Sequence, residues 1–386
     1  MVRPTSRRPL VSARAAALSG NSLTGLFALA RARDALDLAV GTPGYPRPAD
    51  NLIDRAAEAM RAGRNQYEHP AGETALRHWI AGMLGDGADP EQEITVTAGA
   101  TEALYVALLS TLDPGDEVVL FTPGYEQFAA AASLVGARPR FVRLHAPGWR
   151  YDPAELAAAF TDRTRAVLLN TPANPTGRVL TRAELNEIGE LCERWDTTVV
   201  SDEVYRSLVF DGRRHVSVTE IPALTGRTVV IGSLSKSHAV SGWRLGFLRS
   251  DPTRTETLRR VHELTTNGTA APLQAAAGHA ARSVDLAEVC AEMGRRRDLA
   301  QEIFSGMGMK FTPAEGGCFL LADIGGLTGG REDCTAYAHR LLDRAGVLLA
   351  PGTPFFADPQ QGRGYVRIAF NRQAATLREA ERRITA

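Results

Sequence analysis

The stretch Thr228-Val229-Val230-Ile231-Gly232-Ser233-Leu234-Ser235-Lys236-Ser237 joins a short apolar run to a hydroxyl-rich turn that carries a lysine. The 386-residue chain contains 44 lysines and arginines, of which only Lys236 and Lys310 are lysines. A lysine amine forms a Schiff base once its pKa is lowered, whereas the arginine guanidinium stays protonated. A lysine at the end of a predicted strand, in a chain that otherwise uses arginine, therefore indicates a covalent amine rather than a surface charge.

The composition limits the classes of function that this chain can have. Its 44 acidic and 44 basic residues balance, whereas a nucleic-acid-binding protein shows a basic domain or stripe. We find no window close to the roughly 18 apolar residues that span a bilayer, and residues 1–18 lack the apolar segment of a secretory signal. The four cysteines are scattered, which predicts neither a disulfide framework nor a zinc site. We therefore expect a cytoplasmic protein without a metal, a nucleic-acid partner or a membrane partner.

Short β-rich runs alternate with segments of helical spacing between about residues 93 and 250. The predicted strands are residues 94–97, 117–121, 138–144, 166–170, 197–201, 229–231 and 245–248. Thr181 and Glu184 predict a capping box at the start of one intervening helix. This alternation predicts an α/β fold with a mainly parallel, seven-stranded sheet flanked by helices. Ligands bind at the carboxyl ends of the strands in such sheets.

The pattern changes from about residue 286 onward. A long charged helix (286–307), a strand (319–322), a second helix (336–345) and a last strand (365–370) predict a smaller α+β domain. We therefore divide the chain into an N-terminal arm packing on the small domain (1–45), a large domain (46–285) and a small C-terminal domain (286–386). We expect one helix to continue across the boundary between the two domains.

The first two informative strand ends suit a planar, anionic ligand. Gly99, Ala100 and Thr101 form a small-residue turn at a helix N-terminus, where free N–H groups favour a phosphate. Tyr125 lies in the loop after the next strand and can stack on a planar ring, although packing into the core is an equally good interpretation.

The next strand ends add polar groups. Asn174 stands between two prolines and offers a hydrogen-bond donor, or simply belongs to a rigid turn. Asp202 and Tyr205 can hold the N–H of a heterocycle and a phenolic oxygen. In the alternative interpretation, Asp202 is a helix N-cap and the Tyr205 ring packs in the core. Lys236, with Arg244 eight residues later, completes the set. Together the five strand ends match the requirements of pyridoxal phosphate.

The chain resembles the class I/II aminotransferases, the fold-type I pyridoxal-phosphate family, from about Leu36 to the C-terminus. The resemblance is carried by the motifs Asn174-Pro175-Thr176-Gly177, Ser233-Leu234-Ser235-Lys236, Gly242-Trp243-Arg244-Leu245-Gly246 and Val366-Arg367-Ile368. It implies that pyridoxal 5'-phosphate is the cofactor. It also implies transfer of the amino group of an L-amino acid to a 2-oxo acid, through an aldimine on Lys236 and a pyridoxamine intermediate, by a homodimer with shared active sites.

The same resemblance assigns roles to individual residues. Lys236 would carry the aldimine and move the proton, and Asp202 would pair with the pyridinium nitrogen. The other cofactor-binding residues would be Gly99, Ala100, Thr101, Tyr125, Asn174, Tyr205, Ser233, Ser235 and Arg244, together with Tyr67, which would reach the phosphate across the dimer interface. Arg367 would bind the substrate carboxylate, helped by Asn174 and the backbone of Gly41. The charge of Arg244 should also lower the Lys236 pKa.

Other functions remain open at this point. Lyases, decarboxylating deaminases and oxygen-using oxidases of bacterial specialised metabolism use the same scaffold and the same anchor residues. An amino-acid sensor is a further alternative, whereas a Rossmann dehydrogenase is rejected because no G-x-G-x-x-G follows the first strand. The roles of five residues are undecided: Arg47, Glu68, His69, His238 and Cys318. For His238 we favour a structural histidine, and for Cys318 a small buried hydrophobe.

Overall fold

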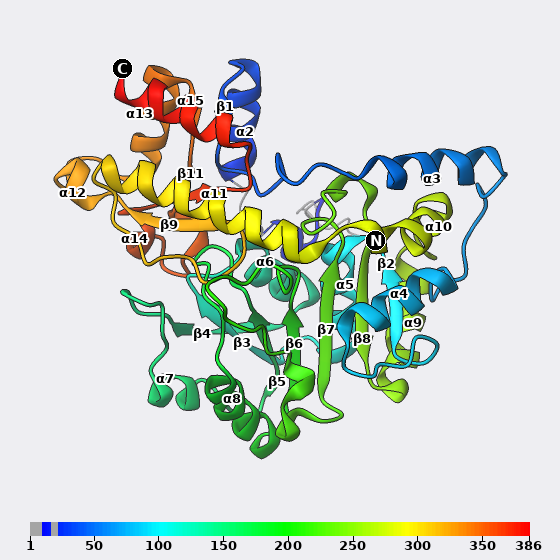
Figure 1. Cartoon of the computed structure of the whole chain (residues 1–386). Coiled ribbons are helices and arrows are strands. Elements are labelled where there is room, and N and C mark those ends of the chain that lie inside the picture. The colour runs from blue at the N-terminus through cyan, green and yellow to red at the C-terminus, as the bar shows by residue number, and fades with distance from the viewer. Residues whose placement is uncertain (1–9, 17–21) are drawn as a thin grey trace, which may run out of the picture.

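A seven-stranded sheet in the order β2-β8-β7-β6-β5-β3-β4 forms the centre of the computed structural model, which describes residues 10–16 and 22–386 (Figure 1). Its strands are β2 (Ile94–Thr97), β3 (Glu117–Thr122), β4 (Arg138–Arg143), β5 (Thr164–Asn170), β6 (Thr198–Asp202), β7 (Thr228–Ser233) and β8 (Gly246–Ser250). Only β8 runs antiparallel to its neighbours β7 and β2. The other pairs are parallel, so the predicted seven-stranded, mainly parallel sheet is confirmed.

Both faces of the central strands are buried, because successive residues of β3 and of β6 enter different hydrophobic cores, whereas the edge strand β4 is mostly exposed. Val119 and Val199 pack into one core with helices α7 (Pro153–Ala158) and α8 (Arg182–Arg194). Their neighbours Val118 and Val200 pack into another core. The helices of that second core are α5 (Gly99–Thr111), α6 (Glu126–Val135) and α9 (Pro252–Thr265). The expected capping box at the start of α8 is present, with Thr181 as N-cap and Glu184 as its partner.

A small unit follows, built on the three-stranded antiparallel sheet β11-β12-β9. Its strands are β9 (Phe319–Asp323), β11 (Ala350–Pro351) and β12 (Tyr365–Ala369), and its main helices are α11 (Leu286–Gly306), α13 (Cys334–Ala345) and α15 (Ala374–Thr385). The N-terminal segment joins this unit, because β1 (Leu36–Asp37) pairs in parallel with β10 (Val347–Leu348). The domain boundaries given above stay a prediction, and residues 1–9 and 17–21 of the expected arm lie outside the described residues.

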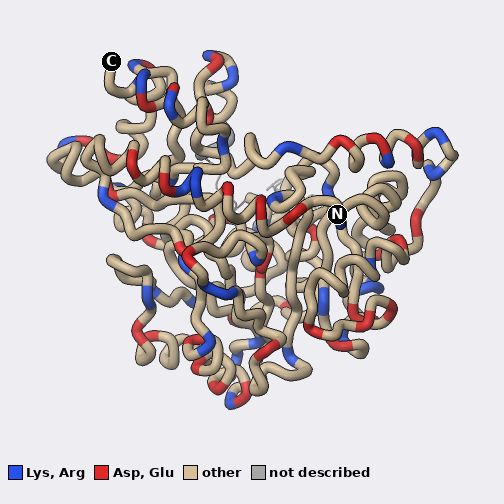
Figure 2. Tube along the Cα trace, in the orientation of Figure 1, with Lys and Arg blue, Asp and Glu red and all other residues tan. Residues whose placement is uncertain are grey.

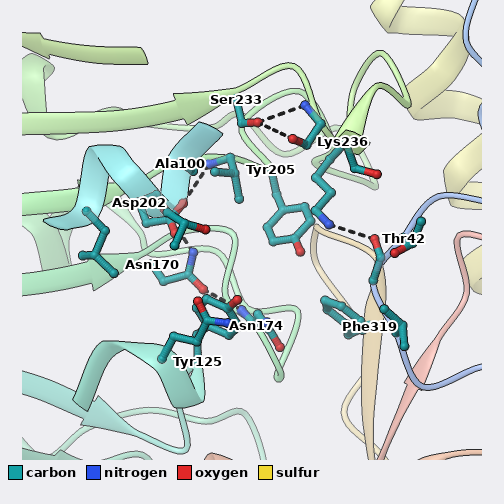
Figure 3. Close-up of a pocket in the computed structure, with 18 of the residues that line it drawn as sticks. Thr42, Ala100, Tyr125, Asn170, Asn174, Asp202, Tyr205, Ser233, Lys236 and Phe319 are labelled. Atoms are coloured by element: carbon teal, nitrogen blue, oxygen red, sulfur yellow. Dashed lines mark hydrogen bonds between the residues drawn. The ribbon is translucent and has the colours of Figure 1, made fainter. Parts of the chain in front are cut away.

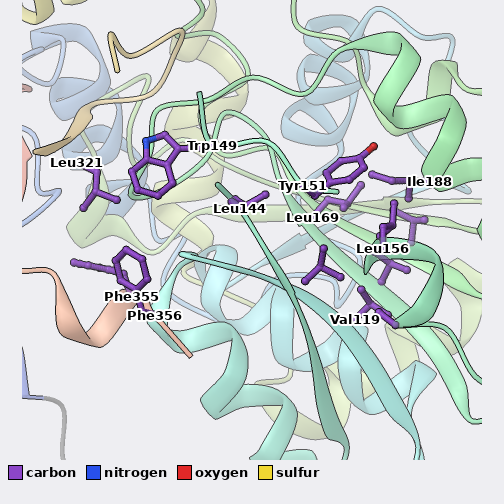
Figure 4. Close-up of a cluster of buried hydrophobic side chains, with 14 of the residues drawn as sticks. Val119, Leu144, Trp149, Tyr151, Leu156, Leu169, Ile188, Leu321, Phe355 and Phe356 are labelled. Atoms are coloured by element: carbon purple, nitrogen blue, oxygen red, sulfur yellow. The ribbon is translucent and has the colours of Figure 1, made fainter. Parts of the chain in front are cut away.

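One hydrophobic cluster connects the small unit to the main sheet (Figure 4). It extends from Leu156 and Ile188 beneath the sheet to Leu321 and Phe355 of the small unit. Trp149 lies at the junction, where its ring packs edge-on against Phe356 and Tyr365 at 6.4 and 5.5 Å between centroids. This shared core fixes the small unit against the carboxyl ends of the strands.

The prediction that one helix continues from the large part into the small unit is wrong. Helix α10 (Ala271–Ala280) ends in a 3₁₀ turn, Ala281–Ser283, and α11 begins afresh at Leu286. The carboxylate of Asp285 accepts hydrogen bonds from the main-chain N–H groups of Ala287 and Glu288. An aspartate that caps these free N–H groups favours a new helix start over continuation.

The remaining helices are α1 (Ala13–Ala16), α2 (Ser22–Ala32), α3 (Asp50–Arg61), α4 (Thr74–Leu84), α12 (Gly325–Thr328) and α14 (Pro359–Gly362). Across the described part of the chain, none of the helices is long and apolar enough to cross a membrane. Figure 2 shows acidic and basic residues interspersed over both parts of the trace, as the zero net charge leads us to expect.

Candidate active site

A cavity of about 430 Å³ opens at the carboxyl ends of the central strands, between the main sheet and the small unit (Figure 3). Ligand sites typically measure roughly 300–1,000 Å³. Twelve of the fourteen predicted site residues line the cavity: Gly41, Ala100, Thr101, Tyr125, Asn174, Asp202, Tyr205, Ser233, Ser235, Lys236, Arg244 and Arg367. Gly99 and Tyr67 are not among the lining residues. The sheet topology thus brings the five predicted strand ends together.

One end of the cavity is suited to an anion. It lies at the N-terminus of α5, where Gly99 has φ +81° and a Cβ added to it would stand 2.3 Å from Arg244 Nη2. The Ser233 hydroxyl donates to the Ser235 Oγ at 2.7 Å beside this turn. Helix N–H groups, hydroxyls and a guanidinium at one place match the donor set of a phosphate site.

Lys236 projects into the middle of the cavity, where its Nζ donates a hydrogen bond to the Gly41 carbonyl at 2.8 Å. Its pKa lies below the ordinary lysine value, chiefly because burial disfavours the charged amine. Arg367 and Arg244 lower this pKa further, with Arg367 having the larger effect. The expected direction for Arg244 is therefore confirmed, but burial is the main cause. A lowered pKa favours the neutral, nucleophilic amine.

Asp202 ends β6 and is buried beside the cavity. Burial raises the pKa of its carboxyl group to about 7. The hydrogen bond that Oδ1 accepts from the Val204 N–H at 3.1 Å lowers this pKa, but its effect is smaller than that of burial. Such a carboxyl group calls for a cationic partner or a proton. The sequence reading missed Asn170, whose Nδ2 donates to the Asp202 carbonyl at 3.1 Å and whose Oδ1 accepts from the Asn174 N–H at 2.7 Å. Its position at the end of β5 could have revealed it.

Arg367 lies on β12 and reaches the cavity from the small unit. Its Nη1 donates to the Asn174 Oδ1 at 3.0 Å, and its Nη2 donates to the Ala39 carbonyl at 2.6 Å. The guanidinium carbon lies 4.2 Å from the centroid of the Phe319 ring and 4.5 Å from that of Phe355. Its planar fork matches a carboxylate.

Segment 37–42, which supplies part of the cavity wall, is held from the small unit by an arginine that the sequence reading missed. Arg372 donates to the carbonyls of Asp37, Val40 and Thr42 at 2.6, 2.6 and 2.8 Å. Asn371 donates to the Gly41 carbonyl at 3.1 Å. These bonds orient main-chain carbonyls along the cavity.

Comparison with known proteins fits this arrangement of residues. The profile of aminotransferase class I and II matches residues 33–384. The chain belongs to this family. Arginine–pyruvate transaminase AruH from Pseudomonas aeruginosa is 37% identical, over 90% of this chain and 88% of its own. Kynurenine–oxoglutarate transaminase 1 from mouse is 30% identical, over 92% of each chain.

Solved structures show the same relationship. N-succinyldiaminopimelate aminotransferase from Mycobacterium tuberculosis superposes with a TM-score of 0.92 at 31% identity, over 97% of this chain and 99% of its own. YbdL from Escherichia coli, described with a methionine aminotransferase function, gives a TM-score of 0.91 at 31% identity, over 97% and 99%. The predicted family, fold and enzyme class are confirmed. This aminotransferase moves an amino group from an amino acid to a 2-oxo acid, and the comparisons favour that reaction over the lyase, deaminase and oxidase alternatives.

The residues left undecided by the sequence lie outside the cavity of this aminotransferase. Arg47 is exposed, and Glu68 pairs with Arg64 at 2.8 Å. His69 Nδ1 accepts a hydrogen bond from the Ala71 N–H at 3.1 Å. Cys318 is buried, in keeping with the interpretation as a small hydrophobe.

His238 gives a prediction for stability. It is buried, with Nδ1 2.8 Å from the Ser237 Oγ and Nε2 3.2 Å from the Ala281 carbonyl, and burial lowers its pKa to about 4. Between about pH 6.5 and 4 the unfolded chain binds this proton and the folded chain does not, so acid destabilises the fold by up to about 3 kcal/mol. We expect urea unfolding at pH 8, 6 and 4.5 to show this loss. His238→Gln should have a correspondingly flatter pH dependence, and an equal dependence in both proteins would contradict the assignment.

Proposed function

We propose that the cavity binds pyridoxal 5'-phosphate, which this chain uses to transfer an amino group from an L-amino acid to a 2-oxo acid. The observation that carries the proposal is the convergence of Lys236, Asp202 and Arg367 on one cavity with an anion-binding end. When bound, the cofactor supplies an aldehyde for the amino group and an electron-withdrawing ring. The residues present fit each part of that molecule.

Each proposed contact has a physical reason. The phosphate would be held by the turn at Gly99, Ala100 and Thr101 and by Ser233, Ser235 and Arg244. The ring would lie against Tyr125, with Asp202 next to its nitrogen, because a buried carboxylate keeps that nitrogen protonated. Asn174 and Tyr205 would donate hydrogen bonds to the phenolic oxygen, since burial raises the Tyr205 pKa and keeps its hydroxyl protonated.

The reaction steps assigned to the chain are binding, orientation and proton transfer. Arg367 would bind the substrate α-carboxylate through its planar fork, which would orient the Cα–H bond toward Lys236. The Lys236 amine, whose pKa is lowered by burial, would accept the Cα proton and return it to the product. Gly41 would leave room for both groups: a Cβ at this position would stand 3.5 Å from Lys236 Nζ and 2.7 Å from Phe319 Cζ.

A half-reaction tests the proposal. Purified holoenzyme would be mixed with single L-amino acids, including arginine, methionine and kynurenine, which occur in the names of the relatives. The products would then be identified by mass. A 2-oxo acid with retention of the nitrogen on the enzyme supports transamination. Oxygen uptake, or release of ammonia, thiol or carbon dioxide, would instead establish one of the alternative reactions.

Replacing Arg367 with lysine should weaken the binding of the substrate carboxylate. Lysine keeps the charge but loses the fork, so we expect KM for the amino donor to rise about 10- to 100-fold. The cofactor should still bind, because Arg367 lies on the substrate side. Steady-state kinetics and a cofactor titration check the two expectations. An unchanged KM would exclude Arg367 as the carboxylate ligand.

We also infer a homodimer with shared active sites, in the cytoplasm. Tyr67 is 88% exposed and does not line the cavity of its own chain, and Ile53, Met60 and Leu264 are exposed hydrophobic residues. The free cysteines of the described residues suit a reducing compartment. Mixing the inactive variants Lys236→Ala and Tyr67→Ala should restore activity if each site uses residues of two chains, because one hybrid site is then intact. No restoration after subunit exchange would contradict sharing.

A further inference from the structure

The Arg367 guanidinium is enclosed by aromatic rings as well as by hydrogen-bond acceptors. Its carbon lies 4.2 Å from the Phe319 centroid and 4.5 Å from the Phe355 centroid, and both rings are buried, with exposed fractions of 2% and 3%. A guanidinium stacks on aromatic faces through its own planar face. The two rings therefore restrict the tilt of the plane in which the donors of Arg367 lie.

The edges of the guanidinium are restricted separately. The bonds from Nη1 to Asn174 Oδ1 and from Nη2 to the Ala39 carbonyl, 3.0 and 2.6 Å long, fix its rotation within that plane. The buried Nε has no hydrogen-bond partner among the described residues. The arginine is thus oriented on its faces and on two edges before any substrate carboxylate binds.

Both rings are themselves fixed by the site. Phe319 begins β9 and pairs with Ala369, two residues after Arg367 on β12, and its ring lies against Gly41 and edge-on to Tyr205 at 6.2 Å. The Phe355 carbonyl accepts a hydrogen bond from the Gly124 N–H at 2.9 Å, which ties it to the loop that carries Tyr125. The rings therefore connect the orientation of Arg367 to the parts of the cavity that would hold the cofactor.

We propose that Phe319 and Phe355 are positioning residues that hold the Arg367 guanidinium in the plane that receives the substrate α-carboxylate. The proposal rests on the carboxylate-binding role proposed above for Arg367. An aliphatic side chain at either position fills part of the space but offers no aromatic face, so the guanidinium regains its freedom to tilt. Binding of the carboxylate then weakens, whereas proton transfer by Lys236 remains intact.

The neighbouring residue Phe356 provides a matched control. It is buried in the same cluster, with an exposed fraction of 8%, but its ring packs on Tyr365 at 5.6 Å rather than on Arg367. Phe355→Leu and Phe356→Leu remove the same atoms from adjacent positions. We expect Phe355→Leu to raise KM for the best amino donor about 5- to 30-fold with kcat nearly unchanged. Phe356→Leu should affect thermal stability alone, and Phe355→Tyr, which keeps the ring, should restore KM.

Equilibrium binding separates positioning from packing. The holoenzyme would be titrated calorimetrically with the des-amino analogue of the best donor, which keeps the carboxylate, and with the corresponding alcohol, which lacks it. Phe355→Leu should weaken binding of the carboxylate by the same factor as KM rises, and leave binding of the alcohol unchanged. Phe319→Leu provides the same measurement at the second ring if Phe355→Leu does not fold.

The outcomes distinguish this proposal from the function on which it rests. Equal losses for carboxylate and alcohol, or equal KM values for Phe355→Leu and Phe356→Leu, would overturn the positioning role while the wild-type enzyme still transaminates. Failure of the wild-type protein to convert any donor to a 2-oxo acid would instead remove the proposed function itself.

Discussion

Replacing Lys236 with alanine should abolish covalent attachment of pyridoxal phosphate and lower kcat/KM for the amino donor by about 10⁴-fold or more. Two contributions are lost together, the amine that attaches the cofactor and the base within reach of the Cα proton. Borohydride reduction of the holoenzyme, followed by peptide mass mapping, should place the cofactor on Lys236 in the wild type and on no peptide of the variant.

The chain offers a matched control for this experiment, because Lys310 is its only other lysine. Lys310 is exposed, its main-chain N–H bonds to the Asp323 carbonyl at 3.1 Å, and it is not among the residues that line the cavity. Lys310→Ala should retain full activity and the same labelled peptide. Retained turnover in Lys236→Ala would rule out the covalent role.

Replacing Asp202 with asparagine should stabilise the cofactor-free protein at alkaline pH while reducing kcat/KM by at least about 100-fold. The carboxyl pKa is raised from 3.8 to about 7 in the folded chain, so between these values the folded state binds more protons than the unfolded state. Stability attributable to this group therefore falls as pH rises through the window. The full penalty, at most about 4 kcal/mol, applies above pH 7. A neutral amide keeps the acceptor for the Val204 N–H and avoids the buried charge.

Urea unfolding of the apoproteins at pH 4 and pH 8 would measure this effect. The stability advantage of Asp202→Asn should be largest at pH 8 and disappear near pH 4. Asp196→Asn serves as the control, since the Asp196 side chain is 95% exposed and its substitution should change stability little at either pH. A wild-type apoprotein at least as stable as Asp202→Asn at pH 8 would show that the Asp202 carboxylate is not destabilised by burial.

Much of the fold and of the cavity wall formed by the main sheet is readable from the sequence, for physical reasons. Most of the strands between residues 94 and 250 are apolar runs closed by turn residues, and the parallel strands bring their carboxyl ends to one edge of the sheet. Lys236 and Asp202 could therefore be placed in one site from their positions after strands. The helix break before Leu286 was not foreseen, because Asp285 looks like any other charged residue of a helix until its capping role is seen.

The cavity wall formed by the small unit and the N-terminal segment is less predictable, because it is built from contacts between distant parts of the chain. Arg372 bonds to carbonyls more than 300 positions away, and Phe355 approaches Arg367 from a 3₁₀ turn without periodic patterning. The sequence around Arg372 or Phe355 does not indicate which distant segment each side chain will contact. The same is true of the Asp202 pKa, which depends mainly on burial.

The carbonyl groups of residues 39–42 have a consequence for engineering the substrate range. Because the bonds from Arg367, Arg372 and Lys236 act on main-chain oxygens, side-chain replacement at Val40 or Thr42 leaves these acceptors in place. Libraries aimed at new amino donors should instead vary other side chains that line the cavity, such as Phe27 of α2 and Gln127 of α6. The main-chain carbonyls of residues 39–42 would then stay unchanged while a new pocket shape is selected.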